Sequence, residues 1–289
     1  MGSTQQLKRR IGSVKNTKQI TKAMELVAAS KMRRAQAEAV TTRDYRSAAQ
    51  EILKRIGGVS DVANHPLFVT RPIDSRLVIV ITSDRGLAGA YNSSVLKRLV
   101  VQLEEDRKAK IKTKVVTVGR VGSTFVARLN GVELASAYPM FAKDPKPSDI
   151  RPIVHSIFEM YSNKSIDAVN IIYTGFVSNI SQEVRVNELL PTKVEGEKTW
   201  SELEVAIFEP GIETIVEPAV TRLIEAQLWQ AVLESLASEH SARMVAMKSA
   251  TDNATEIIDD LTLEFNTARQ AAITQEIAEI VGGAEAVAA

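Results

Sequence analysis

The 289-residue sequence is 45% hydrophobic and 25% charged, a composition that excludes an intrinsically disordered chain and suffices for a buried core. It contains no cysteine, which excludes a disulfide scaffold, a thiol nucleophile and cysteine-ligated metal sites. The net charge of +1 hides an asymmetry: the first 57 residues carry 13 Lys and Arg against 4 Asp and Glu, whereas residues 217–289 carry 4 against 12.

The sequence also disfavours a membrane-spanning protein and a metalloenzyme. No apolar run reaches the roughly 18 residues that a membrane-spanning helix needs, and the first residues lack the apolar core of a secretory signal. We therefore expect an intracellular chain. His65, His155 and His240 lie far apart and outside any HxxxH or HExxH spacing, so we expect no metal site and no cofactor.

The first predicted domain, residues 1–58, is one long helix. No proline occurs between Thr4 and Gly57, and the Gly57-Gly58 pair is a typical helix end. Apolar side chains recur at steps of three and four residues, which predicts a narrow apolar stripe that packs against a partner helix. The members of this stripe are Leu7, Ile11, Val14, Ile20, Met24 and Val27.

The second predicted domain, residues 59–211, alternates strands with helices. Runs rich in β-branched residues at 77–82, 115–118 and 168–174 are predicted strands. Helices are expected near 92–107, 120–129 and 150–161, and the more alternating stretch 183–189 fits an edge strand. This order predicts an α/β, Rossmann-like domain with a largely parallel sheet.

The third predicted domain, residues 212–289, is a second long helix. Pro218 is expected in its first turn, and neither proline nor glycine follows before Gly282. Apolar residues again step by three and four, at Ile258, Leu261, Phe265, Ala268 and Ala272. The opposite charges of the two terminal helices favour an antiparallel coiled coil. Because the second helix is longer, we expect its apolar end to stay bare, at Ile273, Ile277, Ile280 and Val281.

No group of residues indicates catalysis. The segment 83–89 follows a strand and opens a helix, where phosphates often bind, but it matches neither GxGxxG nor the P-loop. The segment 196–199 lacks the upstream glycine of a P-loop. The acidic pair Asp259-Asp260 has no histidine or nucleophile beside it. We interpret the two segments as structural turns and the acidic pair as part of a solvated face.

Several segments, in order along the chain, resemble one known family. The sequence ITQEIAEIVGGA at 273–284 is similar to the C-terminal signature of the gamma subunit of F-type ATP synthases. Residues 9–36 are similar to the N-terminal helix of that family, and 82–87 and 239–247 resemble further family segments. The resemblance extends over the full chain.

The resemblance implies a central rotary stalk that couples rotation of a membrane-embedded c-ring to the conformational cycle of catalytic beta subunits. It implies a terminal coiled coil inside a collar of three alpha and three beta subunits, and an α/β foot beside the epsilon subunit and the c-ring. ATP chemistry would belong to beta, so the chain itself would not be an enzyme. The implied location is peripheral, on the cytoplasmic face of a bacterial inner membrane.

The resemblance also assigns roles to individual residues. Arg269 and Gln270 resemble a pair that contacts a loop of one beta subunit, and Met24 and Lys22 lie where the stalk passes beta. The tip inside the collar would comprise Ile273, Thr274, Glu276 and Ile277, and the c-ring vicinity Ile207, Phe208 and Glu209.

A rival interpretation remains open from the residues alone. The basic first helix would also suit a stand-alone coiled-coil scaffold or a nucleic-acid-binding protein. Against nucleic acid, no aromatic residue precedes Tyr45, and the chain carries its own acidic helix.

Overall fold

The computed structural model describes residues 2–57, 67–141, 145–178, 181–192 and 212–288. The chain forms two compact units. We call residues 30–242 the α/β unit, and residues 1–29 with 243–289 the coiled-coil unit. The elements in chain order are α1 (Gly2–Gly57), β1 (Ser75–Ile81), α2 (Tyr91–Lys108), β2 (Lys112–Val118), α3 (Arg120–Val126), β3 (Glu133–Tyr138), the 3-10 helix η1 (Pro147–Ile150), α4 (Arg151–Ser162), β4 (Ala168–Phe176), β5 (Gln182–Leu190) and α5 (Ile212–Ala288).

The sheet of the α/β unit has the order β3-β2-β1-β4-β5. Strand β1 runs parallel to both β2 and β4, and β2 runs parallel to β3. Strand β5 pairs antiparallel with β4 and forms one edge, as the alternating sequence at 183–189 predicts. The predicted Rossmann-like α/β fold with a largely parallel sheet is confirmed. Strand β3 was not predicted, because its sequence ELASAY contains no β-branched residue.

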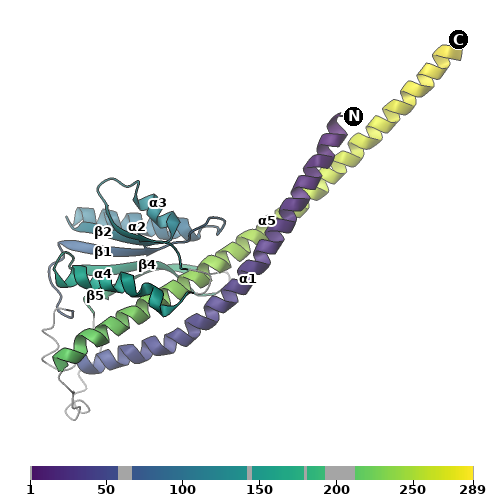
Figure 1. The fold of residues 1–289 in the computed structure, drawn as a ribbon. Coiled ribbons are helices and arrows are strands. Elements are labelled where there is room, and N and C mark those ends of the chain that lie inside the picture. Colours follow the sequence, from purple (N-terminus) through teal and green to yellow (C-terminus); the bar gives the residue numbers. More distant parts are fainter. Residues whose placement is uncertain (1, 58–66, 142–144, 179–180, 193–211, 289) are drawn as a thin grey trace. The chain divides into compact units, whose positions relative to one another are not determined.

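Helices cover both faces of this sheet (Figure 1). Side chains alternate along β1, so Leu77 and Ile79 face one layer and Val78 and Val80 face the other. The first layer is packed by α4 and by residues 216–233 of α5, and the second by α2 with Val126 of α3. The start of α5 is therefore part of the core of the α/β unit.

The prediction that Pro218 lies in the first turn of its helix was wrong. Helix α5 begins at Ile212, so the proline lies inside it. An internal proline removes one backbone hydrogen bond and costs about 3 kcal/mol. Burial of the neighbouring side chains Val216 and Val220 in the core, at 1% and 0% exposure, offsets this cost.

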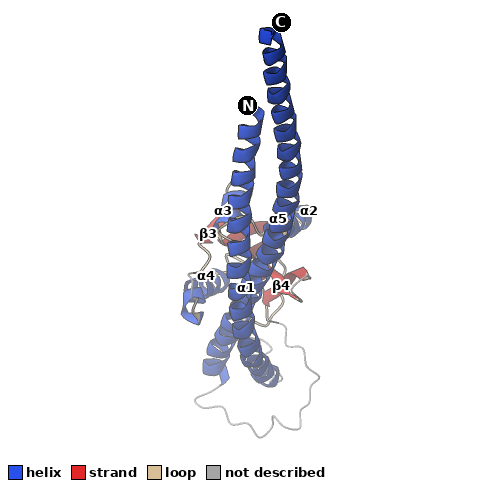
Figure 2. Ribbon diagram, turned by 90° about the vertical axis from the view of Figure 1, so that its right-hand side faces the viewer, coloured by secondary structure: helices blue, strands red, loops and turns tan. Residues whose placement is uncertain are grey.

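The coiled-coil unit is an antiparallel pair formed by α1 and α5, with both chain ends at the same end of the pair (Figure 2). A row of buried and half-buried positions recurs at steps of three and four residues on both helices. On α1 these seam positions are Thr4, Leu7, Ile11, Val14, Lys18, Thr21, Glu25 and Ala28. On α5 they are Met244, Met247, Thr251, Ala254, Ile258, Leu261, Phe265, Ala268 and Ala272.

One part of the predicted α1 stripe lies outside this seam. Ile20 and Val27 are 60% and 56% exposed, and Met24 is only half-buried. The seam instead continues through Lys18, Thr21 and Glu25. The step of three and four is present in both rows, so spacing alone could not decide which row faces α5.

Among the described residues, no helix is long and apolar enough to cross a membrane.

The loop after β2 approaches β1 closely at Gly119. This glycine has φ +102°, and a Cβ there would lie 2.2 Å from the backbone oxygen of Thr82. The next turn is held by the same threonine, because the amide of Gly122 donates to its Oγ1 at 2.9 Å. Position 119 therefore needs glycine for two reasons, backbone conformation and space.

We predict that Gly119→Ala lowers the free energy of unfolding by about 3 kcal/mol, because it adds a steric clash to a strained backbone. Gly131→Ala is the matched control: its φ is +78° but nothing lies within 4 Å of the added carbon. The control should cost only about 1 kcal/mol. Urea unfolding followed by circular dichroism measures both, and equal losses would contradict the clash at position 119.

Candidate partner-binding surface

The carboxyl end of β1, where a Rossmann-like sheet would hold a ligand, is filled by the chain's own groups. The carboxylate of Asp84 accepts hydrogen bonds from the amides of Arg120 and Met140, both at 2.9 Å. The hydroxyls of Tyr91, the first residue of α2, and Ser235 of α5 lie 2.6 Å apart. Segment 83–89 is thus built into the fold, in line with a structural turn, while segment 196–199 lies outside the described residues.

Exposed apolar side chains gather instead on the last turns of α5. Ile273, Ile277, Ile280 and Val281 are 48%, 56%, 71% and 51% exposed, so the expectation of a bare apolar end is confirmed. The seam ends at Ala272, after which every side chain through Ala284 is exposed. A row of bare isoleucines on one helix is typical of a surface that another protein covers.

The predicted polar members of this surface lie on the same turns. Arg269, Gln270, Thr274 and Glu276 are all exposed. The hydroxyl of Thr274 donates to the backbone oxygen of Gln270 at 2.9 Å, so it is turned back onto its own helix. The structure thus places these four residues beside the apolar end of α5.

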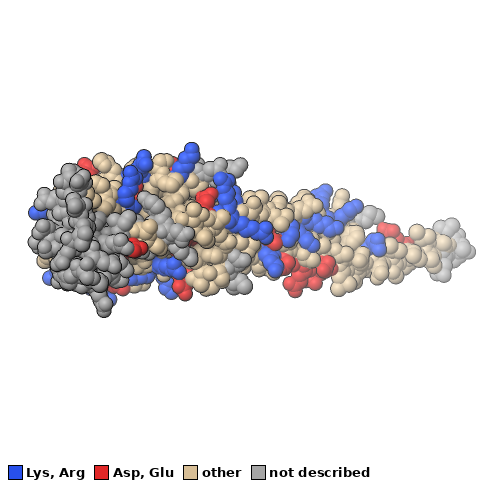
Figure 3. Space-filling view, turned by 90° about the horizontal axis from the view of Figure 1, so that it is seen from below, with Lys and Arg blue, Asp and Glu red and all other residues tan. Residues whose placement is uncertain are grey.

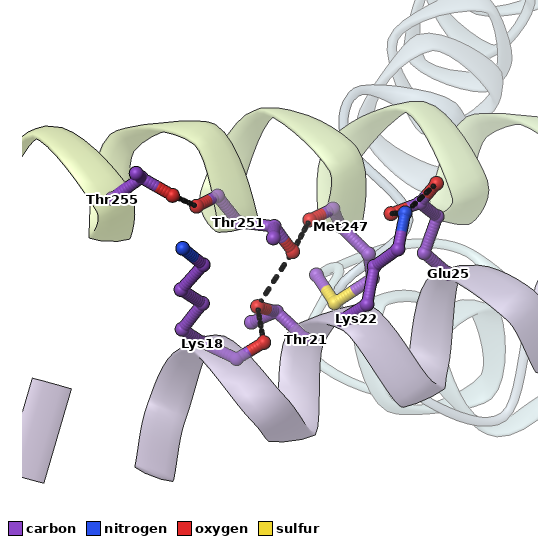
Figure 4. Close-up of polar contacts among 7 residues, drawn as sticks. All are labelled: Lys18, Thr21, Lys22, Glu25, Met247, Thr251 and Thr255. Atoms are coloured by element: carbon purple, nitrogen blue, oxygen red, sulfur yellow. Dashed lines mark hydrogen bonds and ion pairs between the residues drawn. The ribbon is translucent and has the colours of Figure 1, made fainter. Parts of the chain in front are cut away.

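A second exposed apolar group lies on α1. Ile20 and Val27, seven residues apart, lie on one side of the helix with half-buried Met24 next to them, whereas Leu26, which is 60% exposed, lies on another side. Four residues before Leu26, the ammonium group of Lys22 lies 3.0 Å from both carboxylate oxygens of Glu25 (Figure 4). Met24 therefore borders the exposed Ile20 and Val27, and Lys22 lies beside Leu26 on another side of α1. Leu26 was missed as a candidate because it lies off the predicted stripe.

Charged side chains on the coiled-coil unit form separate groups, basic and acidic (Figure 3). The exposed basic group belongs to α1: Lys8, Arg9, Arg10, Lys15 and Lys22. The exposed acidic group belongs to α5: Asp252, Glu256, Asp259 and Asp260. The two helices therefore present surfaces of opposite charge to neighbouring molecules.

The middle of the seam contains a polar contact between the helices. The hydroxyl oxygens of Thr21 and Thr251 lie 2.8 Å apart, and both side chains are buried (Figure 4). Each hydroxyl also lies within hydrogen-bond distance of a carbonyl of its own helix, Thr21 with Lys18 at 3.0 Å and Thr251 with Met247 at 2.8 Å. The two hydroxyl protons can make only two of these three bonds, so when one hydroxyl donates to the other, only the accepting hydroxyl can donate to its own helix.

Comparison with known proteins decides the family. Residues 3–287 match the family model described as ATP synthase. An ATP synthase gamma chain from Psychrobacter arcticus is 38% identical over 297 aligned residues, covering 99% of this chain and 100% of that protein. The chain belongs to the ATP synthase gamma-chain family. The central-stalk subunit of an F-type ATP synthase predicted from the sequence is thereby confirmed, and its partners are other subunits of that complex.

Solved structures agree with this membership. A chain from the central stalk and c-ring structure of the Tetrahymena thermophila mitochondrial ATP synthase is 28% identical, with a TM-score of 0.65 over 80% of this chain and 99% of that one. A chain of the Euglena gracilis mitochondrial ATP synthase has a TM-score of 0.68 over 99% of this chain and 95% of that one. At 19% identity, the latter supports the fold.

Three residues of the predicted gamma-chain sites have no structural description. Ile207, Phe208 and Glu209, assigned to the c-ring vicinity, lie outside the described residues. Among the described residues, no group of three or more His, Asp and Glu is placed to hold a metal ion.

We predict that Thr21→Val and Thr251→Val each lower the free energy of unfolding by about 1 kcal/mol. The double variant should lose less than the sum, with a coupling of about 0.5–1 kcal/mol, because the first substitution already breaks the contact between the helices. Urea unfolding of the wild type, both single variants and the double variant, monitored by the circular-dichroism signal of the helices, gives this double-mutant cycle.

The matched control for this cycle is Thr17→Val with Thr262→Val. Both hydroxyls are exposed and bond only their own helix in the contacts described, to Ser13 and Ile258 respectively. Their losses should be additive. Strict additivity for Thr21 and Thr251 as well would mean that their hydroxyls do not interact.

Proposed function

We propose that the chain is the rotating, non-catalytic shaft of a proton-translocating F-type ATP synthase. In this role, rotation of the c-ring is passed through the α/β unit and α5 to the coiled coil, which drives each catalytic beta subunit through its conformations. The observation that carries the proposal is the bare apolar end of α5, with Ile273, Ile277 and Ile280 all about half exposed or more. Such a surface is stable in water only when other subunits surround it.

The proposed collar consists of three alpha and three beta subunits around the coiled-coil unit. Arg269 and Gln270 would contact a loop of one beta subunit, and Lys22 and Met24 would meet beta further along the shaft. Ile273, Thr274, Glu276 and Ile277 would form the tip within the collar. The exposure of these side chains, with Met24 half-buried, supports contacts of this kind.

The charge distribution supports a mechanism for coupling. One side of the shaft is basic through α1 and the other is acidic through α5. A rotating shaft of this kind presents a different sign of charge and a different apolar surface to each beta subunit in turn. Three chemically identical subunits would then be held in three different states, because an interaction favours only the conformation that it contacts best.

The α/β unit would sit at the membrane end of the stalk, beside the epsilon subunit and the c-ring. Ile207, Phe208 and Glu209 are the residues we propose for the c-ring vicinity. The complex would be peripheral, on the cytoplasmic face of a bacterial inner membrane; the Psychrobacter arcticus relative supports a bacterial source.

Reconstitution tests the function directly. The chain is mixed with alpha and beta subunits from the same source, and the size of the complex is followed together with ATP hydrolysis. We expect a complex of three alpha, three beta and one copy of this chain, with hydrolysis that requires it. A folded chain that neither joins the complex nor changes hydrolysis, but binds duplex DNA in a salt-sensitive manner, would overturn the proposal in favour of a nucleic-acid-binding protein.

We predict that the double variant Ile273→Asp, Ile277→Asp lowers the affinity of assembly roughly 100-fold, because each new carboxylate is buried against the apolar collar. Analytical ultracentrifugation measures assembly. Val101→Asp is the control, since this α2 residue is 40% exposed and lies in the α/β unit. Assembly of the double variant at the affinity of the control would rule out the tip contact.

A further inference from the structure

A short stretch of α5, residues 234–241, is the last part of that helix within the α/β unit and is packed unusually closely. Ser235, Ser238 and Ser241 have no exposed surface, and their spacing of three places them on one side of the helix. Gly89, next to the start of α2, is also near: a Cβ there would lie 4.0 Å from the carbonyl oxygen of Ala242. Small side chains thus let the backbone of α5 approach the ends of the strands.

An ion pair joins this stretch to the edge strand of the sheet. The guanidinium group of Arg185 on β5 lies 3.0 Å from a carboxylate oxygen of Glu234. The other carboxylate oxygen accepts a hydrogen bond from Gln230 at 2.9 Å, so Glu234 is held from both sides. Only 7% of the Glu234 side chain is exposed, and burial makes the loss of its partner costly.

The position of Arg185 is itself fixed by the sheet. Its side chain crosses Gly175 on the neighbouring strand β4, where an added Cβ would lie 2.5 Å from Nε. Any side chain at position 175 would push the guanidinium group away. Because Gly175 has no side chain, it leaves the space through which the Arg185 side chain reaches α5.

A second set of contacts reaches the same stretch from α2 and from the start of β5. The hydroxyl of Tyr91, at the start of α2, lies 2.6 Å from that of Ser235, and the amide of Gln182 donates to Ser241 at 3.3 Å. Successive residues on a helix point about 100° apart. Glu234 and Ser235 are thus held by contacts from two different directions. Two such contacts resist rotation of α5 about its own axis far better than one contact would.

We propose that Arg185 with Glu234, and Tyr91 with Ser235, form a clamp that transmits torque from the α/β unit to α5. The clamp rests on the proposed function as a rotating shaft. It lies just before Arg243, where α5 enters the coiled-coil unit. These four are positioning residues: they set how much of the twist applied to the α/β unit turns the helix.

The test uses the complete ATP synthase reconstituted in vesicles, with proton pumping and ATP hydrolysis measured in the same preparation. We expect Arg185→Gln and Glu234→Gln to assemble and hydrolyse ATP but to lose proton pumping per ATP, and the double variant to be no worse than either. Tyr91→Phe removes only a hydroxyl and should cause a smaller loss of the same kind. Arg98→Gln is the matched control, since Arg98 pairs with Glu105 at 3.6 Å within α2 and contacts no clamp residue in the contacts described.

The outcomes separate the clamp from the function as a whole. Unchanged pumping per ATP in all three single variants, with normal hydrolysis, overturns the clamp and leaves the shaft intact. Wild-type complex that neither assembles nor hydrolyses ATP overturns the shaft itself. If the charged pair proves necessary for assembly, Tyr91→Phe decides: an unchanged pumping ratio in that variant overturns the clamp, and a lowered one supports it.

Discussion

The continuity of α5 is the constraint on which the rest of the structure depends. One uninterrupted helix of 77 residues supplies part of the core of the α/β unit and half of the coiled coil. Its first turns are held by burial, with Val220, Ile224 and Leu228 all fully inaccessible. The sequence of α5 changes along its length to suit both units: a broad apolar face comes first, then a stretch of small and polar residues, then a narrow apolar seam.

Both small and large side chains form the contact between the helices of the coiled coil. Small residues such as Ala28 and Ala254, with the Thr21–Thr251 pair, occupy the contact between the helices. Larger apolar residues such as Ile20 and Leu263 face outward, at 60% and 70% exposure. Leu7, Met247 and Leu261 are buried in the same contact, where burial of large side chains gives more hydrophobic stabilisation. The large apolar residues that remain exposed fit a stalk that leaves apolar surface for other subunits.

The sequence predicts the helices and most strands well, but it predicts poorly which face of a helix packs against its partner helix. Runs of β-branched residues located β1, β2 and β4, and the steps from Ile258 to Ala272 located the seam of α5, because each of these patterns has one physical solution. The row of Ile20, Met24 and Val27 allowed two arrangements, facing α5 or facing away from it. Periodicity indicates that a helix face is apolar but not which partner covers that face. The bare end of α5 was predictable because helix lengths alone leave it without a helical neighbour, whereas the ion pair of Arg185 required the three-dimensional fold.

The end of the seam at Ala272 has a thermodynamic consequence for the chain on its own. Beyond it, α5 continues as a lone helix to Ala288. A solitary helix of about this length is marginally stable in water, since nucleation is costly and no packing offsets it. Its backbone amides will therefore exchange with solvent deuterium much faster than those of the paired turns before it. Enclosure by neighbouring subunits would supply the missing packing, so that assembly completes the folding of the last turns.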